Sequence, residues 1–347
     1  MNKSPKGGRI PTNTQSRLME SNSLLDVMQD GREFESLFSY RYPNINIMLE
    51  LRRCISEIEE IRHHPVVCYI ADVLKGKPFS SIEHMDDLPF KEMIENVPAN
   101  ETEIDIVLVT RGGDPDQINS FVSVLRPRFE RVNFILLDKA MSAGTMFIMS
   151  GDEIIMSPQS KFGPIDPQVQ NNIGRYVPAQ SLLLALDDIR KRGEERIIQG
   201  MQPLWTDLQL LNQIDVRDIG VAKIASQHSI DMVAHFLANY KFLSWNNHAD
   251  GREVTRREKE QRANRIAALL CKHSHWKSHG YTINRDIAES VLQLKITHSE
   301  SIEGLDRAMR RMWAVIFWIF ESTPYTKFLI SNNYCINRRI PEKNITQ

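Results

Sequence analysis

The sequence of 347 residues lacks the features that mark several large classes of protein. Its four cysteines, at positions 54, 68, 271 and 335, form no CxxC pair and are too sparse for a disulfide framework, which favours a reducing compartment. Lys and Arg (43) balance Asp and Glu (44), so we expect no nucleic acid as a main partner. The GxxxxGK[ST] motif is missing, so any ATP dependence would come from a separate ATPase or regulator.

Long apolar runs are missing as well. The first residues carry positive charge but no apolar segment of the kind that a signal peptide needs. The longest apolar stretch near the C-terminus, residues 313–320, is far shorter than the roughly 20 residues of a membrane-spanning helix. We therefore expect a cytoplasmic protein with no membrane span.

What is present indicates a folded α/β protein. Hydrophobic residues (41%) and charged residues (25%) are near the averages of globular proteins. Residues 1–21 are rich in Gly, Pro, Asn and Ser and predict a flexible tail. In residues 22–200 an N-terminal helix precedes strands that alternate with helices, which predicts a layered core around a mostly parallel sheet. Residues 201–347 show helical periodicity and predict a helical C-terminal region.

The individual elements follow from periodicity and from turn residues. Predicted strands cover residues 66–71, 104–110, 132–137 and 154–156, with one more within 160–165. Predicted core helices lie between Pro43 and Pro65 and at residues 86–97, 115–125, 142–150 and 179–192. The helices predicted after residue 200 cover residues 205–211, 230–240, 256–273, 285–294 and 302–321.

Ser142 lies where a predicted buried strand turns into an apolar helix. A hydroxyl at this corner sits at the positive end of the helix dipole. The small residues that follow, Ala143 and Gly144, let the backbone of a substrate approach closely. This arrangement predicts a nucleophilic serine. The alternative is that Ser142 only caps the helix, since serine is a favoured N-cap residue.

A nucleophile for acyl transfer also needs amide donors where the oxyanion forms. Gly112 and Gly113 follow the predicted strand 104–110, and glycine there permits unusual dihedral angles and close approach of N–H groups to a ligand. The amide of Ala143 is a second candidate donor. We therefore predict an oxyanion hole from Gly112, Gly113 and Ala143. The alternative is that the two glycines form only a tight turn.

These motifs occur in a fixed order: a Gly-Gly turn after one strand, SAGT after the next, and then DEIIMSPQSKFGPIDPQ. Together they resemble the serine dehydrogenase proteinase family, which is grouped with signal-peptide-peptidase-like and Clp-type serine proteases. The resemblance covers residues 66–179, and TDLQLL, EKEQRANRIAALL and WKSHGYTINR resemble that family's C-terminal region. It implies a ClpP/crotonase-like ββα superhelix, hydrolysis of peptide bonds in a peptide or protein substrate, no cofactor, and homo-oligomers.

The proton acceptor is the point at which the sequence departs from these relatives. Clp proteases use a histidine on the strand after the nucleophile's helix, but no histidine lies between His84 and His228. Asp166 lies 24 residues after the serine, close to the place of that histidine. Signal-peptide-peptidase relatives use a downstream lysine instead, and the nearby lysines here are Lys161 and Lys191. All three residues are candidate bases, and Asp166 could equally form a turn.

Two further interpretations keep the same fold. In one, the protein is a crotonase-type acyl-thioester enzyme. In the other, it is an inactive scaffold that binds peptides or partners. A metal site at Cys271, His273, His275 and His279 is not expected, because the spacing matches no standard structural zinc site.

Overall fold

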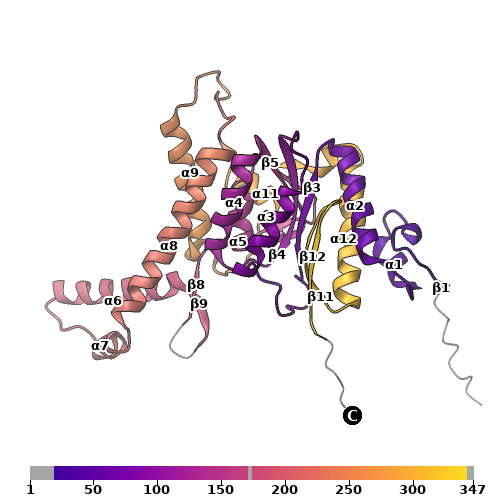
Figure 1. The fold of residues 1–347 in the computed structure, drawn as a ribbon. Helices are drawn as coiled ribbons and strands as arrows, with labels where there is room; N and C mark the ends of the chain where they lie inside the picture. The colour runs from indigo at the N-terminus through magenta and orange to yellow at the C-terminus, as the bar shows by residue number, and fades with distance from the viewer. Residues whose placement is uncertain (1–18, 171–173, 342–347) are drawn as a thin grey trace, which may run out of the picture.

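The computed structural model describes residues 19–170 and 174–341, and its centre is one eight-stranded sheet (Figure 1). The strand order is β10-β6-β5-β4-β3-β11-β12, and β7 pairs with the end of β5. Strands β10, β6, β5, β4 and β3 are parallel, whereas β11 and β12 are antiparallel to their neighbours. The predicted α/β fold with a mostly parallel sheet is confirmed.

The strands of the parallel part of the sheet were predicted from short apolar runs, as expected for strands that are buried on both faces of a sheet. These strands are β3 (Val66–Ala71), β4 (Glu103–Thr110), β5 (Arg131–Ala140), β6 (Glu153–Met156) and β7 (Lys161–Phe162). The helices between them are α3 (Asp87–Glu95), α4 (Pro115–Arg128) and α5 (Ala143–Ile148). Parallel neighbours need such crossovers, so each strand of this part ends at the same edge of the sheet.

Helices cover both faces of the sheet (Figure 1). Helices α2 (Ile47–Arg62) and α12 (Leu305–Ser322) pack on one face in a single buried cluster. The crossover helices cover the other face, and α8 (Val216–Phe236) and α9 (Arg256–Cys271) form an outer layer against them. Both clusters contain residues from before and after position 200, so the predicted boundary there does not divide the core.

The C-terminal region contains the predicted helices and also three strands that the sequence did not predict. Strand β10 (Thr297–His298) extends the sheet beside β6, while β11 (Tyr325–Ile330) and β12 (Cys335–Arg339) extend it beyond β3. The region is therefore part of the sheet as well as a helical layer. Residues 1–18 of the predicted tail lie outside the described residues, and Met19–Glu20 forms strand β1 beside β2 (Tyr40–Arg41).

The remaining elements are short, apart from α6, which protrudes from the body of the protein together with α7. They are η1 (Leu25–Val27), α1 (Glu33–Phe38), η2 (His84–Asp86), β8 (Gln168–Gln170), β9 (Tyr176–Pro178), α6 (Ala179–Ile198), α7 (Trp205–Asn212), the π-helical turn η3 (Leu237–Lys241), α10 (His273–Trp276), α11 (Arg285–Ser290) and η4 (Ser299–Ser301).

Helices α6 and α7 and the start of α8 form an arm that extends from the body of the protein (Figure 1). We call this segment, residues 179–224, the arm. Large apolar side chains are exposed along it, including Ile198 (85% exposed), Trp205 (72%) and Val216 (78%). Monomeric proteins rarely expose so many large apolar side chains in one region.

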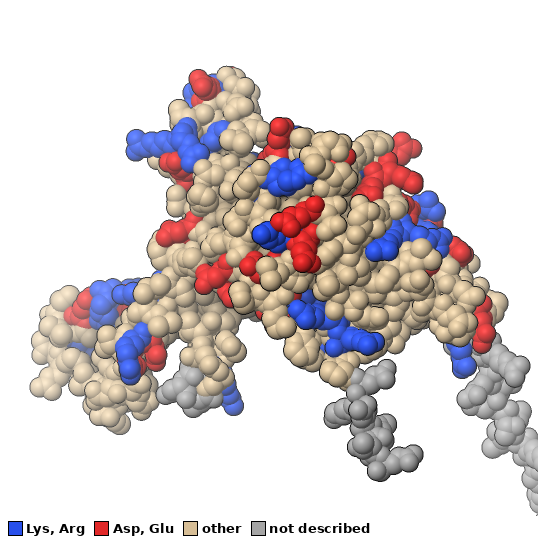
Figure 2. All heavy atoms as spheres, in the orientation of Figure 1, with Lys and Arg blue, Asp and Glu red and all other residues tan. Residues whose placement is uncertain are grey.

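Charge is mixed over the face of the molecule that Figure 2 shows, where acidic and basic side chains are interspersed. This agrees with the net charge of −1. Within residues 19–170 and 174–341, no helix combines the length and the apolar character that crossing a membrane requires.

A buried ion pair joins β11 to the segment before α3. Lys327 is fully buried, and its Nζ lies 2.8 and 2.7 Å from the two carboxylate oxygens of Asp86. The same Nζ donates to the carbonyl of Ser81 at 2.7 Å, and the hydroxyl of Tyr69 donates to Asp86 at 2.7 Å. Every charge in this cluster therefore has hydrogen-bond partners.

We expect Asp86→Ala to lower the free energy of unfolding by about 3–5 kcal/mol, because it leaves the Lys327 ammonium buried without its counter-ion. Chemical denaturation measures this loss. Lys91→Ala is the matched control, because Lys91 makes an exposed ion pair with Glu95 at 3.8 Å. The control should lose less than about 1 kcal/mol. Equal losses in the two variants would contradict this account of the cluster.

Candidate active site

Ser142 occupies the corner between β5 and α5 that the sequence predicted. It is the N-cap residue of α5, with φ 53° and ψ −117°, and its side chain makes no capping hydrogen bond. A non-glycine residue at positive φ costs roughly 1–3 kcal/mol and persists where the surrounding structure holds it. A strained strand-to-helix turn of this kind presents the nucleophilic serine in α/β-hydrolases. The geometry does not support the alternative that Ser142 serves as a side-chain cap.

The Gly-Gly turn lies directly against this corner. Gly112 has φ +100°, and a Cβ built on it would lie 2.7 Å from Ser142 Cβ and 2.6 Å from the carbonyl oxygen of Met141. Gly113 forms a parallel bridge to Ile82, and a Cβ there would lie 2.2 Å from the Ile82 carbonyl oxygen. Only glycine fits at either position, because any side chain would collide with backbone or with the serine.

Two backbone amides at this corner, those of Gly113 and Ala143, make no hydrogen bond within the described residues. The residues on either side of Gly113 bond the backbone of Ile82. The Ile82 N–H donates to the Gly112 carbonyl, and the Asp114 N–H donates to the Ile82 carbonyl, both at 2.9 Å. In such a bridge the Gly113 N–H points away from Ile82. Within the described residues, neither this N–H nor that of Ala143 donates a hydrogen bond.

Two predicted site residues have other roles. The Gly112 N–H donates to Thr110 Oγ1 at 3.0 Å, which corrects its predicted role as an oxyanion donor. The Gly144 N–H donates to the Met141 carbonyl at 2.8 Å. Gly144 is buried, and a Cβ there would lie 2.4 Å from Thr110 Cγ2, so its absent side chain lets α5 pack on the end of β4. Its predicted contact with a substrate backbone stays a prediction.

Asp166 is buried and binds two histidines from the C-terminal region. Its Oδ1 lies 2.9 Å from His279 Nδ1, and its Oδ2 lies 2.9 Å from His273 Nδ1. The carboxylate is 1% exposed, whereas the side chains of His273 and His279 are 18% and 31% exposed. A carboxylate that binds Nδ1 selects the tautomer in which Nε2 accepts a proton. Each oxygen of the Asp166 carboxylate therefore bonds one histidine side chain.

The segments that carry Ser142, Asp166 and His279 meet at Gly163. A Cβ on Gly163 would lie 2.5 Å from Met141 Cε and 3.3 Å from the Tyr281 carbonyl oxygen. Met141 immediately precedes Ser142, and Tyr281 follows His279 by two residues. The backbone of Phe162 also bonds Ile283 in both directions, at 3.0 and 2.8 Å. The loop with His279 thus lies beside the serine's corner.

His273 is held on the other side of the carboxylate by the helical region. Its N–H donates to Gln180 Oε1 at 2.8 Å, and Gln180 Nε2 lies 3.5 Å from Cys271 Sγ. This places His273 between α6 and α9, whereas His279 belongs to the loop that contacts Gly163.

The two lysines proposed as bases are engaged elsewhere. Lys191 is exposed on α6 and lies 2.6 Å from Asp187, and the hydrogen bond to that carboxylate raises the pKa of Lys191. A base needs a lowered pKa, so we do not assign this role to Lys191. Lys161 Nζ lies 3.5 Å from Asp138 Oδ1.

A groove lies between the start of α4 and the outer helix α8. Its volume is about 460 Å³, and it is lined by Pro115, Pro167, Val221, Ile224, His228 and neighbouring residues. Pro115 follows Gly113 by two residues, and Pro167 follows Asp166 directly, so the groove adjoins both halves of the site. His228 Nε2 and Asp116 Oδ1, 3.0 Å apart, close one side.

The contacts of His273 and His279 with Asp166 were not predicted from the sequence. The two histidines were weighed only as metal ligands, and within the described residues no group of three or more His, Cys, Asp or Glu side chains is arranged to hold a metal ion. The signal that could have found His279 is the segment WKSHGYTINR, which resembles the C-terminal region of the same proteinase family and contains it. The contact with Asp166 spans 113 residues, so spacing could not reveal it.

Comparison with known proteins supports the resemblance to this family. Residues 36–200 match the family of ClpP-like SDH-type serine proteinases. One uncharacterized protein of Methanocaldococcus jannaschii is 33% identical over 160 residues, which cover 44% of this chain and 49% of that protein. A second protein of that organism is 32% identical over 84 residues, 24% of this chain and 28% of its own length. The chain thus spans about half, or less, of these relatives.

Two solved structures are similar to this chain at a low level. A mutant of the 1510-N membrane-bound stomatin-specific protease, in complex with a substrate peptide, has 13% identity and a TM-score of 0.35, covering 62% of this chain and 72% of that one. A probable enoyl-CoA hydratase/isomerase from Mycobacterium abscessus has 12% identity and a TM-score of 0.29, covering 72% and 82%.

Proposed function

Because residues 36–200 match the ClpP-like SDH-type serine proteinases, we propose that this protein is a serine peptidase with Ser142 as its nucleophile. The observation that carries the proposal is the strained backbone of Ser142, at φ 53°. The glycine turn lies against this residue, and the N–H groups of Gly113 and Ala143 donate no hydrogen bond within the described residues. A helix cap would need neither feature.

In the proposed reaction, Ser142 Oγ attacks the carbonyl carbon of the scissile peptide bond. The carbonyl oxygen becomes an oxyanion, and the N–H groups of Gly113 and Ala143 donate to it. Each such donor contributes a factor of about 10²–10³ in rate. The resulting acyl-enzyme is then hydrolysed by water, which returns Ser142 to its free form.

His279 is the proposed general base. Its Nδ1 binds Asp166, so its Nε2 is the nitrogen that accepts the Ser142 proton and passes it to the leaving amine. The contacts of Gly163 with Met141 and Tyr281 favour His279 over His273. Ser142, Asp166 and His279 then form a triad in the chain order Ser-Asp-His, which other serine hydrolases also use. No hydrogen bond joins the serine to His279 without substrate, and such bonds often tighten only when substrate binds.

The groove beside α8 is the proposed binding surface for the substrate peptide. Val221 (55% exposed) and Ile224 (72% exposed) give it an apolar wall. A peptide with apolar side chains near the scissile bond suits this wall, since burying such side chains is favourable. Kinetics with a set of peptides that differ only in the residue before the scissile bond tests this preference.

A fluorophosphonate probe tests the proposed function directly, because it labels only an activated serine. We expect the peptide that contains Ser142 to gain the mass of the probe, as measured by mass spectrometry. Ser142→Ala should abolish labelling, while Ser150→Ala, which changes a buried serine of the same segment, should leave it intact. An unlabelled wild-type protein would favour the alternative of an inactive scaffold.

The arm is the proposed contact surface of a homo-oligomer. Its exposed apolar side chains, such as Ile198 and Trp205, would be buried by a second copy of the chain. We expect Ile198→Glu with Trp205→Glu to reduce the mass in solution toward the 40.1 kDa of one chain. Light scattering measures this mass. The control Leu88→Glu changes an exposed leucine outside the arm and should leave the assembly intact. A wild-type protein that is already monomeric would contradict the proposal.

A further inference from the structure

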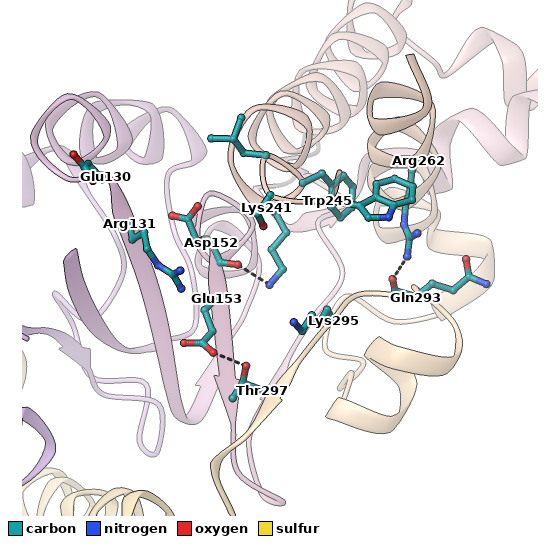
Figure 3. A pocket seen from close by; sticks show the side chains of 13 residues that line it. Glu130, Arg131, Asp152, Glu153, Lys241, Trp245, Arg262, Gln293, Lys295 and Thr297 are labelled. Atoms are coloured by element: carbon teal, nitrogen blue, oxygen red, sulfur yellow. Dashed lines mark hydrogen bonds between the residues drawn. The ribbon is translucent and has the colours of Figure 1, made fainter. Parts of the chain in front are cut away.

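A second cavity, shown in Figure 3, is lined by residues at the start of β5, whereas Ser142 follows the end of that strand. It opens between the first residues of β5 and β6 and the segment that joins α8 to α9. Its volume of about 620 Å³ falls within the range of small-molecule sites, about 300–1,000 Å³. Strand β5 has ten residues, so the cavity is about 30 Å from the serine's corner.

Three cations line this cavity without a carboxylate partner among the described residues. Lys241 Nζ donates only to the backbone carbonyl of Asp152, at 3.2 Å. Arg262 donates to the backbone carbonyl of Gln293. Lys295 is exposed at the cavity wall and makes no ion pair or hydrogen bond within the described chain. Figure 3 shows the Lys241 and Lys295 side chains near each other in the cavity.

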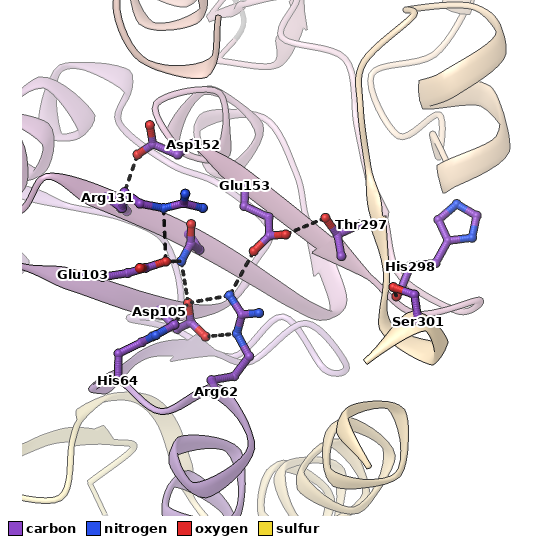
Figure 4. A network of polar contacts seen from close by, with 12 residues as sticks. Arg62, His64, Glu103, Asp105, Arg131, Asp152, Glu153, Thr297, His298 and Ser301 are labelled. Carbon is purple, nitrogen blue, oxygen red and sulfur yellow. Dashed lines mark hydrogen bonds and ion pairs between the residues drawn. The ribbon is translucent and has the colours of Figure 1, made fainter. Parts of the chain in front are cut away.

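The carboxylates of the same wall are already engaged or lie at its rim. Asp152 binds Arg126 at 2.7 Å. Glu153 binds Arg62 at 2.9 Å (Figure 4). Both arginines lie outside the cavity lining. Glu130 is exposed at the rim and points away from the lysines in Figure 3. The wall therefore offers positive charge that its own carboxylates do not neutralise by direct contact.

Two of the three cations, Lys241 and Arg262, are held in place by the structure around them, whereas Lys295 is exposed. Lys241 is only 8% exposed and ends the π-helical turn η3, a rare element that often marks functional sites. The Arg262 guanidinium stacks over Trp245, 4.7 Å from the ring centroid, and its Nε is buried without a partner. Such stacking orders the guanidinium and leaves its edge to face a ligand.

The environment of Lys241 is unfavourable to its charge. Burial lowers the pKa of Lys241 to about 8, although Glu153 and Asp152 act to raise it, and the positive charge of Lys295 lowers it further. An anion between the two ammonium groups would replace their repulsion with two favourable interactions.

We propose that this cavity binds a small molecule through a phosphate or carboxylate group held by Lys241, Lys295 and Arg262. These are the three cations that the wall leaves without a carboxylate partner, and they lie on the segment after α8, before β10 and on α9. The ligand's oxyanion lies between the two ammonium groups, and the rest of the molecule occupies the cavity. The site is distinct from the proposed hydrolytic site.

Calorimetric titration of the full-length protein with inorganic phosphate and, separately, with citrate tests the proposal, at an ionic strength held constant with sodium chloride. We expect saturable binding of at least one anion. Which of the two binds more tightly distinguishes a phosphate ligand from a carboxylate ligand. Lys295→Gln and Lys241→Met should each weaken binding about tenfold to a hundredfold, the effect of losing one charged hydrogen bond.

Lys223→Gln is the matched control, because it removes one exposed lysine from α8 outside the cavity. It should leave the affinity unchanged. Lys295 is exposed, so Lys295→Gln tests the site even where Lys241→Met impairs folding. The proposal is overturned by the absence of binding of both anions to the wild-type protein, by unchanged affinity in Lys295→Gln, or by an equal loss in Lys223→Gln.

Discussion

Ser142→Ala is expected to lower kcat for peptide hydrolysis by about 10⁶, the largest effect of any single substitution in this chain. The reason is that the substitution removes the only atom that forms the covalent bond to the substrate. A residual rate above that of the uncatalysed reaction should remain, because the Gly113 and Ala143 amides still stabilise an oxyanion. Hydrolysis of a fluorogenic peptide or of casein measures the change.

The free energy of unfolding of the Ser142→Ala protein is the control that separates lost activity from lost folding. Alanine lacks only the hydroxyl, and that hydroxyl makes no capping hydrogen bond, so the free energy of unfolding should change little. Ser142→Gly should lose activity to the same extent as Ser142→Ala, and it should also relieve the strain of the positive φ. Undiminished hydrolysis by a stable Ser142→Ala protein would remove Ser142 from the mechanism and leave only the fold.

His279→Ala is expected to lower kcat by about 10⁴–10⁶, because it removes the proposed acceptor of the serine's proton. Asp166→Asn should cost about 10⁴, since an amide no longer selects the tautomer with a basic Nε2. Both losses should appear in kcat with little change in KM, because neither side chain lines the groove proposed to bind the substrate. Steady-state kinetics separates the two parameters.

His273→Ala is the matched control for His279→Ala. Both histidines contact the same buried carboxylate at 2.9 Å, so both variants remove one hydrogen bond from Asp166. If His273 only positions Asp166, its loss should lower kcat by about tenfold, equivalent to one hydrogen bond. A larger loss for His273→Ala than for His279→Ala would exchange the roles that we assign to the two residues.

The sequence predicted those parts of the site that depend on local pattern. The strand before Ser142, the small residues after it and the Gly-Gly turn are each visible within a few residues, and the structure confirms their positions. Local pattern could not assign the hydrogen bonds of each glycine. Gly112 was predicted to donate to an oxyanion, but its N–H is bonded to Thr110, a contact that depends on one side-chain rotamer.

The parts that the sequence did not predict all depend on contacts between distant segments. Strand β11 carries Lys327 in an otherwise apolar run, and only its partner Asp86, from the segment before α3, explains how a lysine can be buried there. The pairing of His279 with Asp166 spans 113 residues in the same way. Such pairs appear only once the chain is folded, because each residue alone resembles a surface side chain.

A crystal structure of the fluorophosphonate adduct at Ser142 is the most direct test of the proposed mechanism. The phosphonyl oxygen stands in for the oxyanion of the tetrahedral intermediate. We predict that it lies about 2.7–3.1 Å from the amide nitrogens of both Gly113 and Ala143, with His279 Nε2 facing the serine oxygen. A phosphonyl oxygen that points away from these two amides, or an adduct that forms on another residue, would contradict the account.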